Sequence, residues 1–398
     1  MKHEIWQLKP DESGLEVSLA IENVIQNLAL QINKNEFSEK IISLAFFIDS
    51  GKKEFNVQRR LIISRLKDVF KNPPAFSIIG QPPASNEKVL LEVNVISMSS
   101  AEATIQYGKV NDEISYTKVE TNDFCEVYYS GLTVSDENKS IYDKIFDSFA
   151  ILETALLEQG LGMNNIVRQW NYLENIIEEK LCDDGILQNY QSLNNIRHTF
   201  YSKYKFCNGY PSATGIGMNS GGFILECIAV KEKHDLQIMP VQNPAQISAY
   251  DYSNKVLIGS QMHALSTPKF ERAKLYAFEL NCYELFISGT AAIHSEGSLA
   301  KENSEEQTII TLENIDTLFN SASERLNKFN KRVIDHSLSY LRVYIKRRDD
   351  FIKVKAICDK YAGSTKPVYL IADICRDELL VEIEGLINIR TDDMASAE

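Results

Sequence analysis

Two segments that lie far apart in the chain have the same order of residue types. EVYYSGLTVS covers residues 126–135, and ELFISGTAAIHSEG covers residues 284–297. Each begins with Glu, continues with aliphatic or aromatic residues, and then has Ser-Gly and a second short apolar run. Such runs are typical of buried strands. A strand that occurs twice indicates an internal repeat, which constrains the fold more than any other feature of this sequence.

The same succession of elements follows both segments: a polar turn, an amphipathic helix, a strand, a second helix and two closing strands. The helices are predicted from apolar residues at helical spacing. The N-terminal part of the chain shows the succession again, so three units of the form ββαβαββ are expected. The predicted helices cover residues 15–32, 55–70, 141–162, 189–205, 305–326 and 348–362.

The last strands of the three units align as LLEV, ILEC and LVEI, which puts Glu92, Glu226 and Glu382 at one position. A strand-helix-strand order packs the helices on one face of each sheet and leaves the other face bare. Three units cover their bare faces if they close into a ring. The predicted fold class is therefore α+β, with three tandem units forming a pseudo-trimer whose sheets face inward and whose helices face outward.

The unit boundaries follow from the repeat. We expect a degenerate first unit at residues 1–110, a second unit at 111–235 and a third at 283–398, with a connecting segment at 236–282 that carries cleft residues. A chain of 398 residues has room for two to four domains at roughly 100–200 residues each. Because such a ring closes its own interfaces, a monomer or a weak homo-oligomer is expected.

Charge and cysteine content exclude several kinds of partner. The net charge of −13 repels phosphate backbones, so no nucleic-acid binding is expected. The seven cysteines include no CxxC pair and the histidines have no HxH or HExxH spacing, so no metal site is predicted. TGIGMNSGG lacks the Lys-Ser/Thr ending of a P-loop, so no nucleotide cofactor is expected. Without a long apolar run or signal peptide character, a cytoplasmic protein that does not cross a membrane is predicted.

The order of short motifs resembles a known family. RQWNYLENI, PSATGIGM, NPAQISAYDY, STPKFERA, LFISGTAAI and QTIITLENI follow one another between residues 168 and 315. This order is similar to the chorismatase branch of the YjgF/YER057c/UK114 (Rid) superfamily, over about residues 125–320. The resemblance implies Rid-like (chorismate-mutase-like) units with ligand clefts between neighbours. It also implies an enzyme that hydrolyses the enol ether of chorismate, or of a close relative, to pyruvate and a cyclohexadiene or hydroxybenzoate product, without a metal.

Two other functions remain open from the sequence. A non-catalytic protein that binds a small acid would keep the pocket but lack the proton donor. A Rid-type enamine or imine hydrolase would use an arginine that follows a Pro-Ala pair in that family. The matching positions here are Phe76, Ala213 and Tyr369, so the arginine is absent from all three units.

Protonation of the enolpyruvyl methylene carbon needs a carboxylic acid whose pKa is raised by burial. The family has a glutamate a few residues after Ser-Gly-Thr-Ala, and Glu296 has a similar place here. Gly297 equally supports a turn in which Glu296 is exposed. Glu226 is the second candidate acid, because its strand should face the Ser-Gly-Thr strand of the third unit. Its alternative is the structural role of a glutamate that recurs in three units.

Two substrate carboxylates are best held by arginine forks. The resemblance suggests Arg272, in STPKFERA, and Arg197, in NNIRHTFY, each with an exposed surface position as the alternative. Tyr250 is either a phenolic donor or a packing aromatic, and Asn171 is a candidate donor beside Trp170, which is assigned to the core. The remaining predicted contacts to this small-molecule carboxylate are Gly217, Ser288, Gly289 and Thr290.

Overall fold

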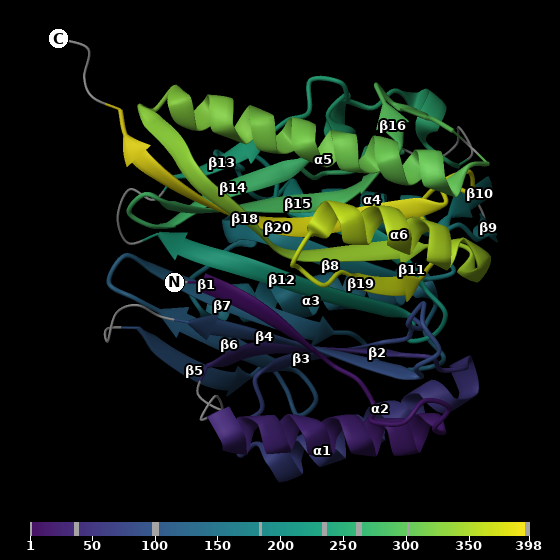
Figure 1. Ribbon diagram of the computed structural model, residues 1–398. Helices are drawn as coiled ribbons and strands as arrows, with labels where there is room; N and C mark the ends of the chain where they lie inside the picture. Colours follow the sequence, from purple (N-terminus) through teal and green to yellow (C-terminus); the bar gives the residue numbers. More distant parts are fainter. Residues whose placement is uncertain are drawn as a thin grey trace.

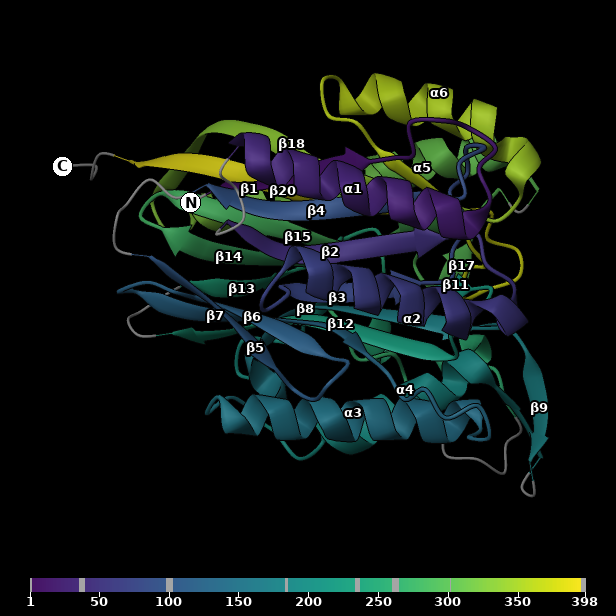
Figure 2. The ribbon, with the colours of Figure 1, turned by 90° about the horizontal axis from the view of Figure 1, so that it is seen from below.

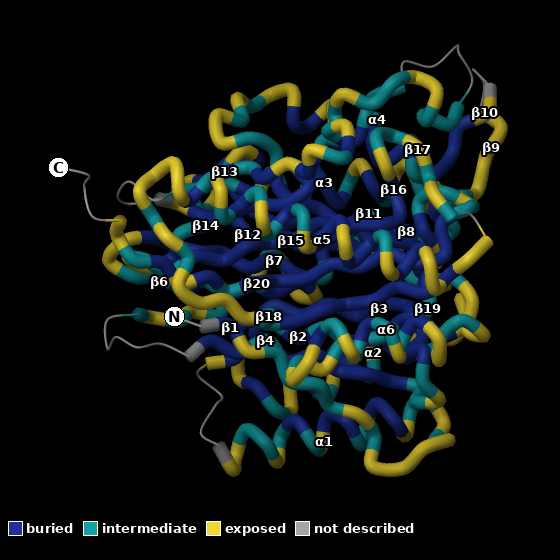
Figure 3. The backbone as a smooth tube through the Cα atoms, turned by 45° about the horizontal axis from the view of Figure 1, so that its top comes forward, coloured by how far each residue is buried: buried dark blue, intermediate teal, exposed yellow. Residues whose placement is uncertain are grey.

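The computed structural model describes residues 2–35, 40–97, 103–182, 185–232, 237–259, 265–300 and 302–394. Three sheets fill the middle of the molecule, and the helices lie on its outside (Figure 1, Figure 2). Buried residues follow the strands, whereas exposed residues gather on the outer helices and loops (Figure 3). None of the helices in these ranges is long and apolar enough to cross a membrane.

The first sheet has four strands in the order β1-β4-β2-β3 and carries two helices. Its elements are β1 (Lys2–Leu8), α1 (Val17–Asn35), β2 (Ile41–Ile48), α2 (Lys52–Val69), β3 (Ala75–Ile79) and β4 (Val89–Ser97). The closing strand β4 lies between the first and middle strands, and β3 runs parallel to β2.

The second sheet repeats this arrangement and adds two strands at one edge, in the order β11-β8-β12-β7-β6-β5. Its strands are β5 (Thr104–Lys109), β6 (Ser115–Glu120), β7 (Phe124–Leu132), β8 (Ile166–Glu174), β11 (Ser212–Met218) and β12 (Phe223–Glu232). Its helices are α3 (Ile141–Glu158) and α4 (Asn189–Tyr201), and β9 (Glu179–Cys182) and β10 (Gly185–Gln188) form a separate hairpin.

The third sheet has the same order again, β13-β14-β15-β20-β18-β19. Its strands are β13 (Ile238–Val241), β14 (Ala273–Glu279), β15 (Cys282–Ala291), β18 (Lys331–Ile345), β19 (Val368–Ile371) and β20 (Val381–Asp393). Its helices are α5 (Ser304–Asn327) and α6 (Phe351–Ala362), and β16 (Ile293–His294) pairs with β17 (Gly297–Ser298). All six helices predicted from the sequence are thus confirmed, with ends within a few residues.

The edge strands refine the expected unit boundaries. β5 precedes residue 111 but pairs with β6 in the second sheet. β13 and β14 lie in the segment 236–282 but pair with each other and with β15, so this segment contributes strands to the third sheet. Backbone hydrogen bonding of an otherwise open edge explains both additions.

Strand pairing also shows which residues correspond between the units. In each unit, one residue near the start of the first strand lies opposite a residue of the closing strand. A glutamate precedes that closing-strand residue by four positions. These opposite pairs are His3–Ile96, Glu126–Val230 and Glu284–Asn388, and the glutamates are Glu92, Glu226 and Glu384. The counterpart in the third unit is therefore Glu384, which corrects the sequence alignment that had placed Glu382 there.

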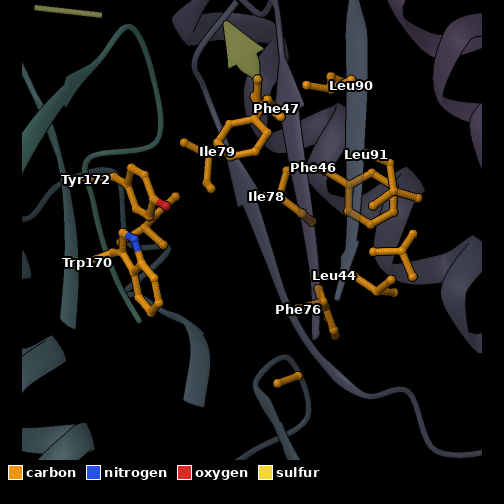
Figure 4. Close-up of a cluster of buried hydrophobic side chains, with 14 of the residues drawn as sticks. Leu44, Phe46, Phe47, Phe76, Ile78, Ile79, Leu90, Leu91, Trp170 and Tyr172 are labelled. Atoms are coloured by element: carbon orange, nitrogen blue, oxygen red, sulfur yellow. The ribbon is translucent and has the colours of Figure 1, made fainter. Parts of the chain in front are cut away.

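The bare faces of the sheets pack together in one interior. A single apolar cluster contains buried residues of all three sheets, including Phe47, Tyr172 and Tyr344. Figure 4 shows Trp170 and Tyr172 of β8 across from side chains of β2 and β3, with Leu90 and Leu91 of β4 farther away in the same cluster. Arg342 joins the first and third units within this interior, since its Nη1 lies 2.6 Å from Glu384 Oε1 and its Nη2 contacts Glu92.

Candidate active site

A pocket lies between the second and third units, where α4 and β11 approach β15 and the start of β20. Arg272, just before β14, and the segment 256–258 also line it. The remaining charged and polar lining groups include Tyr190, Asn194, Arg197, Tyr252, Arg376 and Glu382. Three guanidinium groups and one carboxyl group therefore meet in one enclosed space.

Glu382 is the carboxyl group of this pocket. Its side chain is buried, and burial raises its pKa to about 8, with a further upward contribution from the negative charge of Glu384. Arg168 and Arg272 oppose this shift without cancelling it. Close to neutral pH most of Glu382 is thus a protonated acid.

Glu384, two residues further along β20, organises the wall behind Glu382. Its carboxylate accepts hydrogen bonds from Arg168 Nη2 (2.7 Å) and Trp170 Nε1 (2.9 Å), and it also contacts Thr214 Oγ1. Thr214 Oγ1 in turn accepts the backbone N–H of Gly289 at 3.0 Å. This buried network fixes the strand β15 beside the Glu382 carboxyl group.

Two of the arginines have donors that are free to bind a ligand. Arg197 donates from Nη2 to Asn194 Oδ1 at 2.5 Å, and Arg272 donates from Nη2 to the backbone oxygen of Ile247 at 2.8 Å. Within the part of the chain that the structure describes, the buried Nε atoms of Arg197 and Arg272 have no hydrogen-bond acceptor. Buried donors normally have partners, so these groups are available to a bound anion.

Tyr252 connects Arg272 with the third arginine. Its hydroxyl accepts a hydrogen bond from Arg272 Nη2 at 2.5 Å. The guanidinium carbons of Arg272 and Arg376 each lie 5.4 Å from the centre of its ring, which is within the range of cation–π attraction. Arg376 is anchored by a hydrogen bond from its Nη1 to the backbone oxygen of Glu296 (2.7 Å).

Arg272, Arg197 and Gly289 are the predicted site residues that the structure brings together in this pocket. Ser288 and Asn171 support its walls without lining it. Ser288 Oγ accepts from Ala213 N (2.9 Å) and donates to Glu271 O (2.6 Å), and Asn171 Nδ2 donates to Thr214 O (3.0 Å). The adjacent hydroxyl of Thr290 donates to Ser288 O (2.9 Å).

Three other predicted residues lie away from the pocket lining. The amide N of Gly217 donates to Asp373 O at 2.7 Å, so this glycine allows a close approach of two backbone segments. Tyr250 OH accepts from Gln242 Nε2 at 2.9 Å and faces Glu271. Glu226 lines a different, interior cavity with Glu92 and Arg342, where burial raises its pKa to about 7.

Glu296 lies at the turn between β16 and β17. Its carboxylate accepts hydrogen bonds from the backbone N and the Oγ of Ser253, at 2.9 and 2.7 Å. These bonds lower the pKa of Glu296, so its carboxyl group is ionised at neutral pH. A general acid would have to be protonated there. Of the two environments expected from the sequence, the structure places Glu296 in the turn.

The pocket residues that were not predicted from the sequence include Glu382 as an acid, Tyr252 and Arg376. Glu382 and Glu384 lie two apart on one strand and so share a face, but the sequence alone does not tell which of them reaches the pocket. In the described ranges, no group of three or more His, Cys, Asp or Glu side chains could hold a metal ion.

Comparison with known proteins places this architecture in a family. The model of the family "Chorismatase FkbO/Hyg5-like, N-terminal" matches residues 100–229. A 3-hydroxybenzoate synthase of Streptomyces hygroscopicus is 24% identical over 356 residues, which cover 82% of this chain and 98% of that relative. A chorismatase of the same organism is 26% identical over 268 residues, covering 64% of this chain and 67% of the relative.

Shorter and structural matches agree with this placement. A RutC family protein of Pyrococcus horikoshii is 30% identical over 105 residues, covering 26% of this chain and 76% of that protein. A crystal structure of a chorismatase superposes with a TM-score of 0.67 at 19% identity, covering 97% of this chain and 98% of that one, which shows a shared fold. The chain belongs to the chorismatase branch of the YjgF/YER057c/UK114 (Rid) superfamily.

Proposed function

We propose that this protein hydrolyses the enol ether of chorismate, or of a close relative, and releases pyruvate with a cyclohexadiene or hydroxybenzoate product. The observation that carries the proposal is a buried acid, Glu382, with its pKa raised to about 8 in the same pocket as three arginines. The substrate has two carboxylates and an acid-labile enol ether, so it needs both cations and a proton donor. The names of the similar relatives, 3-hydroxybenzoate synthase and chorismatase, favour this chemistry.

The arginines would bind the two carboxylates. Arg197 and Arg272 enter from different units, and each has a buried Nε that lacks a partner among the described residues. Carboxylate oxygens of the substrate would satisfy these donors, and a guanidinium can hold a carboxylate through two parallel hydrogen bonds. Binding through both units would fix the enolpyruvyl group relative to Glu382.

Glu382 would then act as the general acid. Its proton passes to the terminal methylene carbon of the enolpyruvyl group, which leaves an oxocarbenium ion at the ether carbon. The Glu382 carboxylate formed in this step stabilises that cation at short range. Addition of water to the ether carbon and cleavage of its bond to the ring oxygen release pyruvate and a dihydroxycyclohexadiene carboxylate. Release of pyruvate with no net uptake of water gives a hydroxybenzoate instead.

The pocket must open to admit this substrate. Its free space is about 60 Å³, which is below the roughly 300 Å³ at the lower end for small-molecule sites. Residues 256–258 line the pocket from an irregular segment that contains only a short 3₁₀ turn. We expect this segment to move outward on binding, because it is irregular and its residues are only partly buried.

We further propose the pseudo-trimer arrangement, with units near residues 1–110, 111–235 and 283–398 and the segment 236–282 joined to the third sheet. The repeated strand order supports it. Cavities between the first and second, second and third, and third and first units also support it, because a ring of three units has three such clefts. A ring closed within one chain favours a monomer or a weak homo-oligomer.

The test is pyruvate release from chorismate by the purified protein, without added metal or nucleotide, measured by coupling to lactate dehydrogenase. Glu382→Gln should lower kcat by about 10²–10⁴, the usual contribution of a positioned proton donor. Glu296→Gln is the matched control and should leave the rate within about twofold, because its carboxylate is bound to Ser253.

The opposite pattern would return the acid role to Glu296. Absence of pyruvate with the unmodified protein, together with tight binding of chorismate, would favour a non-catalytic binding protein. Turnover of an imine but not of chorismate would favour the Rid-type hydrolase.

A further inference from the structure

A second cavity, of about 220 Å³, lies between the first and second units. Strand pairing relates it to the active-site pocket. In the second unit, Leu132 follows Gly131 and lies opposite Leu225. In the third unit, Thr290 follows Gly289 and lies opposite Ile383. The residues before Leu225 and Ile383 are Ile224 and Glu382, so an isoleucine occupies the place of the acid in this second cavity.

The wall of the second cavity is apolar and aromatic over one part. Phe55 of α2, Phe76 and Ile78 of β3, and Ile224 of β12 all line it. Gly131 lies beside the backbone oxygen of Phe76, and an added methyl group there would overlap that oxygen. This glycine therefore allows a close approach of the two units beside the cavity.

Three cations line the same cavity, and they differ in how they are paired. Lys52 Nζ lies 2.5 Å from Glu174 Oε1, and Arg59 Nη1 lies 2.8 Å from Glu113 Oε2. The third cation, Lys144, has no ion pair within the residues that the structure describes.

The Arg59 side chain is only 10% exposed, whereas that of Glu113 is 48% exposed. An ion pair whose carboxylate lies in solvent contributes little, so Arg59 can exchange this partner for a ligand at small cost.

The two other carboxylates of the cavity each accept a hydrogen bond. Glu174 Oε2 accepts the backbone N–H of Gly222 at 2.9 Å in addition to its pair with Lys52. Glu137, on the exposed rim, accepts a hydrogen bond from Asn56. Lys144, which has no ion pair among the described residues, and Arg59, whose partner is exposed, are the groups that can attract an anion beside the apolar wall.

We propose that this second cavity is a binding site for a small carboxylate with a flat apolar body, such as a benzoate. The apolar wall contacts the ring, and Arg59 and Lys144 hold the carboxylate. Ile224 supplies no proton, so the site binds without catalysing. The proposal does not depend on turnover in the active-site pocket, because no residue lines both cavities.

The test is calorimetric titration of benzoate into the full-length Arg272→Ala variant, in which the active-site pocket has lost one carboxylate ligand. We expect one benzoate per chain. Lys144→Gln and Arg59→Gln, each made in this background, should raise the Kd by about tenfold or more, as expected for loss of a charged hydrogen bond. Arg65→Gln is the matched control, because Arg65 lies on the same helix and pairs with Glu22 away from the cavity. Benzylamine, with the same ring and the opposite charge, should not bind.

Loss of all benzoate binding in Arg272→Ala would overturn the proposal, since the active-site pocket would then be the only site. A Kd unchanged by both Lys144→Gln and Arg59→Gln would overturn it as well, and so would binding of benzylamine in place of benzoate. If Arg59→Gln proves unfolded by circular dichroism, Lys144→Gln decides, because Lys144 has no ion pair with a described residue to lose.

Discussion

The Glu382 carboxyl group lies directly against the Cα atom of Gly289, so that a methyl group added to this glycine would overlap Glu382 Oε1. The glycine belongs to the Ser-Gly strand of the third unit, and the acid belongs to the closing strand beside it. The repeated Ser-Gly motif thus leaves space in this unit for a carboxyl group. The network from Glu384 through Thr214 holds the Gly289 N–H in place.

Gly289→Ala should therefore displace Glu382 from its position. We expect kcat for pyruvate release to fall by at least about 10²-fold, because a proton donor that moves by an ångström loses much of its catalytic contribution. The control is Gly297→Ala, since the nearest atom to an added methyl group there is 3.8 Å away. Equal rates for the two variants, at similar melting temperatures, would contradict this placement of the acid.

The pH dependence of kcat/KM should report the Glu382 carboxyl group. Burial, aided by the charge of Glu384, raises its pKa to about 8, and the protonated form is the active one. The rate should stay level below that pH and fall about tenfold per pH unit above it, as for any single acid that must be protonated. An acid with the pKa of Glu296, which lies below the ordinary value of 4.5, would instead have lost most of its activity before neutral pH is reached. A stopped-flow or coupled assay from pH 5 to pH 10 distinguishes the two.

Removing the hydroxyl groups of two tyrosines near the pocket should change the KM for chorismate by different amounts. Tyr252→Phe removes the hydroxyl that accepts from Arg272, so the guanidinium loses its orientation and the KM for chorismate should rise about tenfold. Tyr250→Phe should leave KM within about twofold, because its hydroxyl contacts Gln242 and Glu271 rather than a pocket arginine. A larger rise in KM for Tyr250→Phe would mean that Tyr250 contacts the substrate.

The sequence predicted the elements of the fold well, because each depends on local periodicity. The helices from α1 to α6 and the paired Ser-Gly strands are all present where apolar spacing indicated them. The position of the acid depends instead on pairing between strands. β7 and β12 shift register between Leu225 and Cys227, and β15 and β20 shift between Ile287 and Thr290. The two bulges lie at equivalent positions, so they do not change the offset between the units. Glu382 and Glu384 lie two residues apart on one strand, and only the strand pairing shows that Glu384 corresponds to Glu226.

The pocket side chains from irregular segments were harder to predict. Tyr252 follows a 3₁₀ turn, and Arg376 lies in the loop before β20, where no periodicity tells which side chain points inward. Arg197 and Arg272 were predicted because STPKFERA and NNIRHTFY resemble motifs of the family, and not from helix or strand periodicity. The resemblance thus revealed part of the site, and tertiary packing determined the rest.

Glu226 provides a test of the interior that is separate from catalysis. Burial raises its pKa to about 7, and the charges of Glu92 and Glu384 add to this effect while Arg342 opposes it. The value in the folded protein is thus above the ordinary value of 4.5. Below pH 4.5 the carboxyl group is protonated in both the folded and the unfolded state. Stability is lost as the pH rises through 7, because ionisation costs more in the folded state.

Glu226→Gln should remove this loss. One pKa unit corresponds to about 1.4 kcal/mol. The free energy of unfolding of the variant, relative to that of the unmodified protein, should therefore increase by up to about 3 kcal/mol between pH 5 and pH 8. Urea unfolding at both pH values measures the difference. Glu324→Gln, on the exposed side of α5, is the control and should leave the pH dependence unchanged. The rate of pyruvate release should stay within about twofold in both variants, because neither side chain lines the active-site pocket. A variant Glu226→Gln that loses stability at pH 8 and also loses activity would instead indicate an ionised Glu226 that supports the site through Arg342.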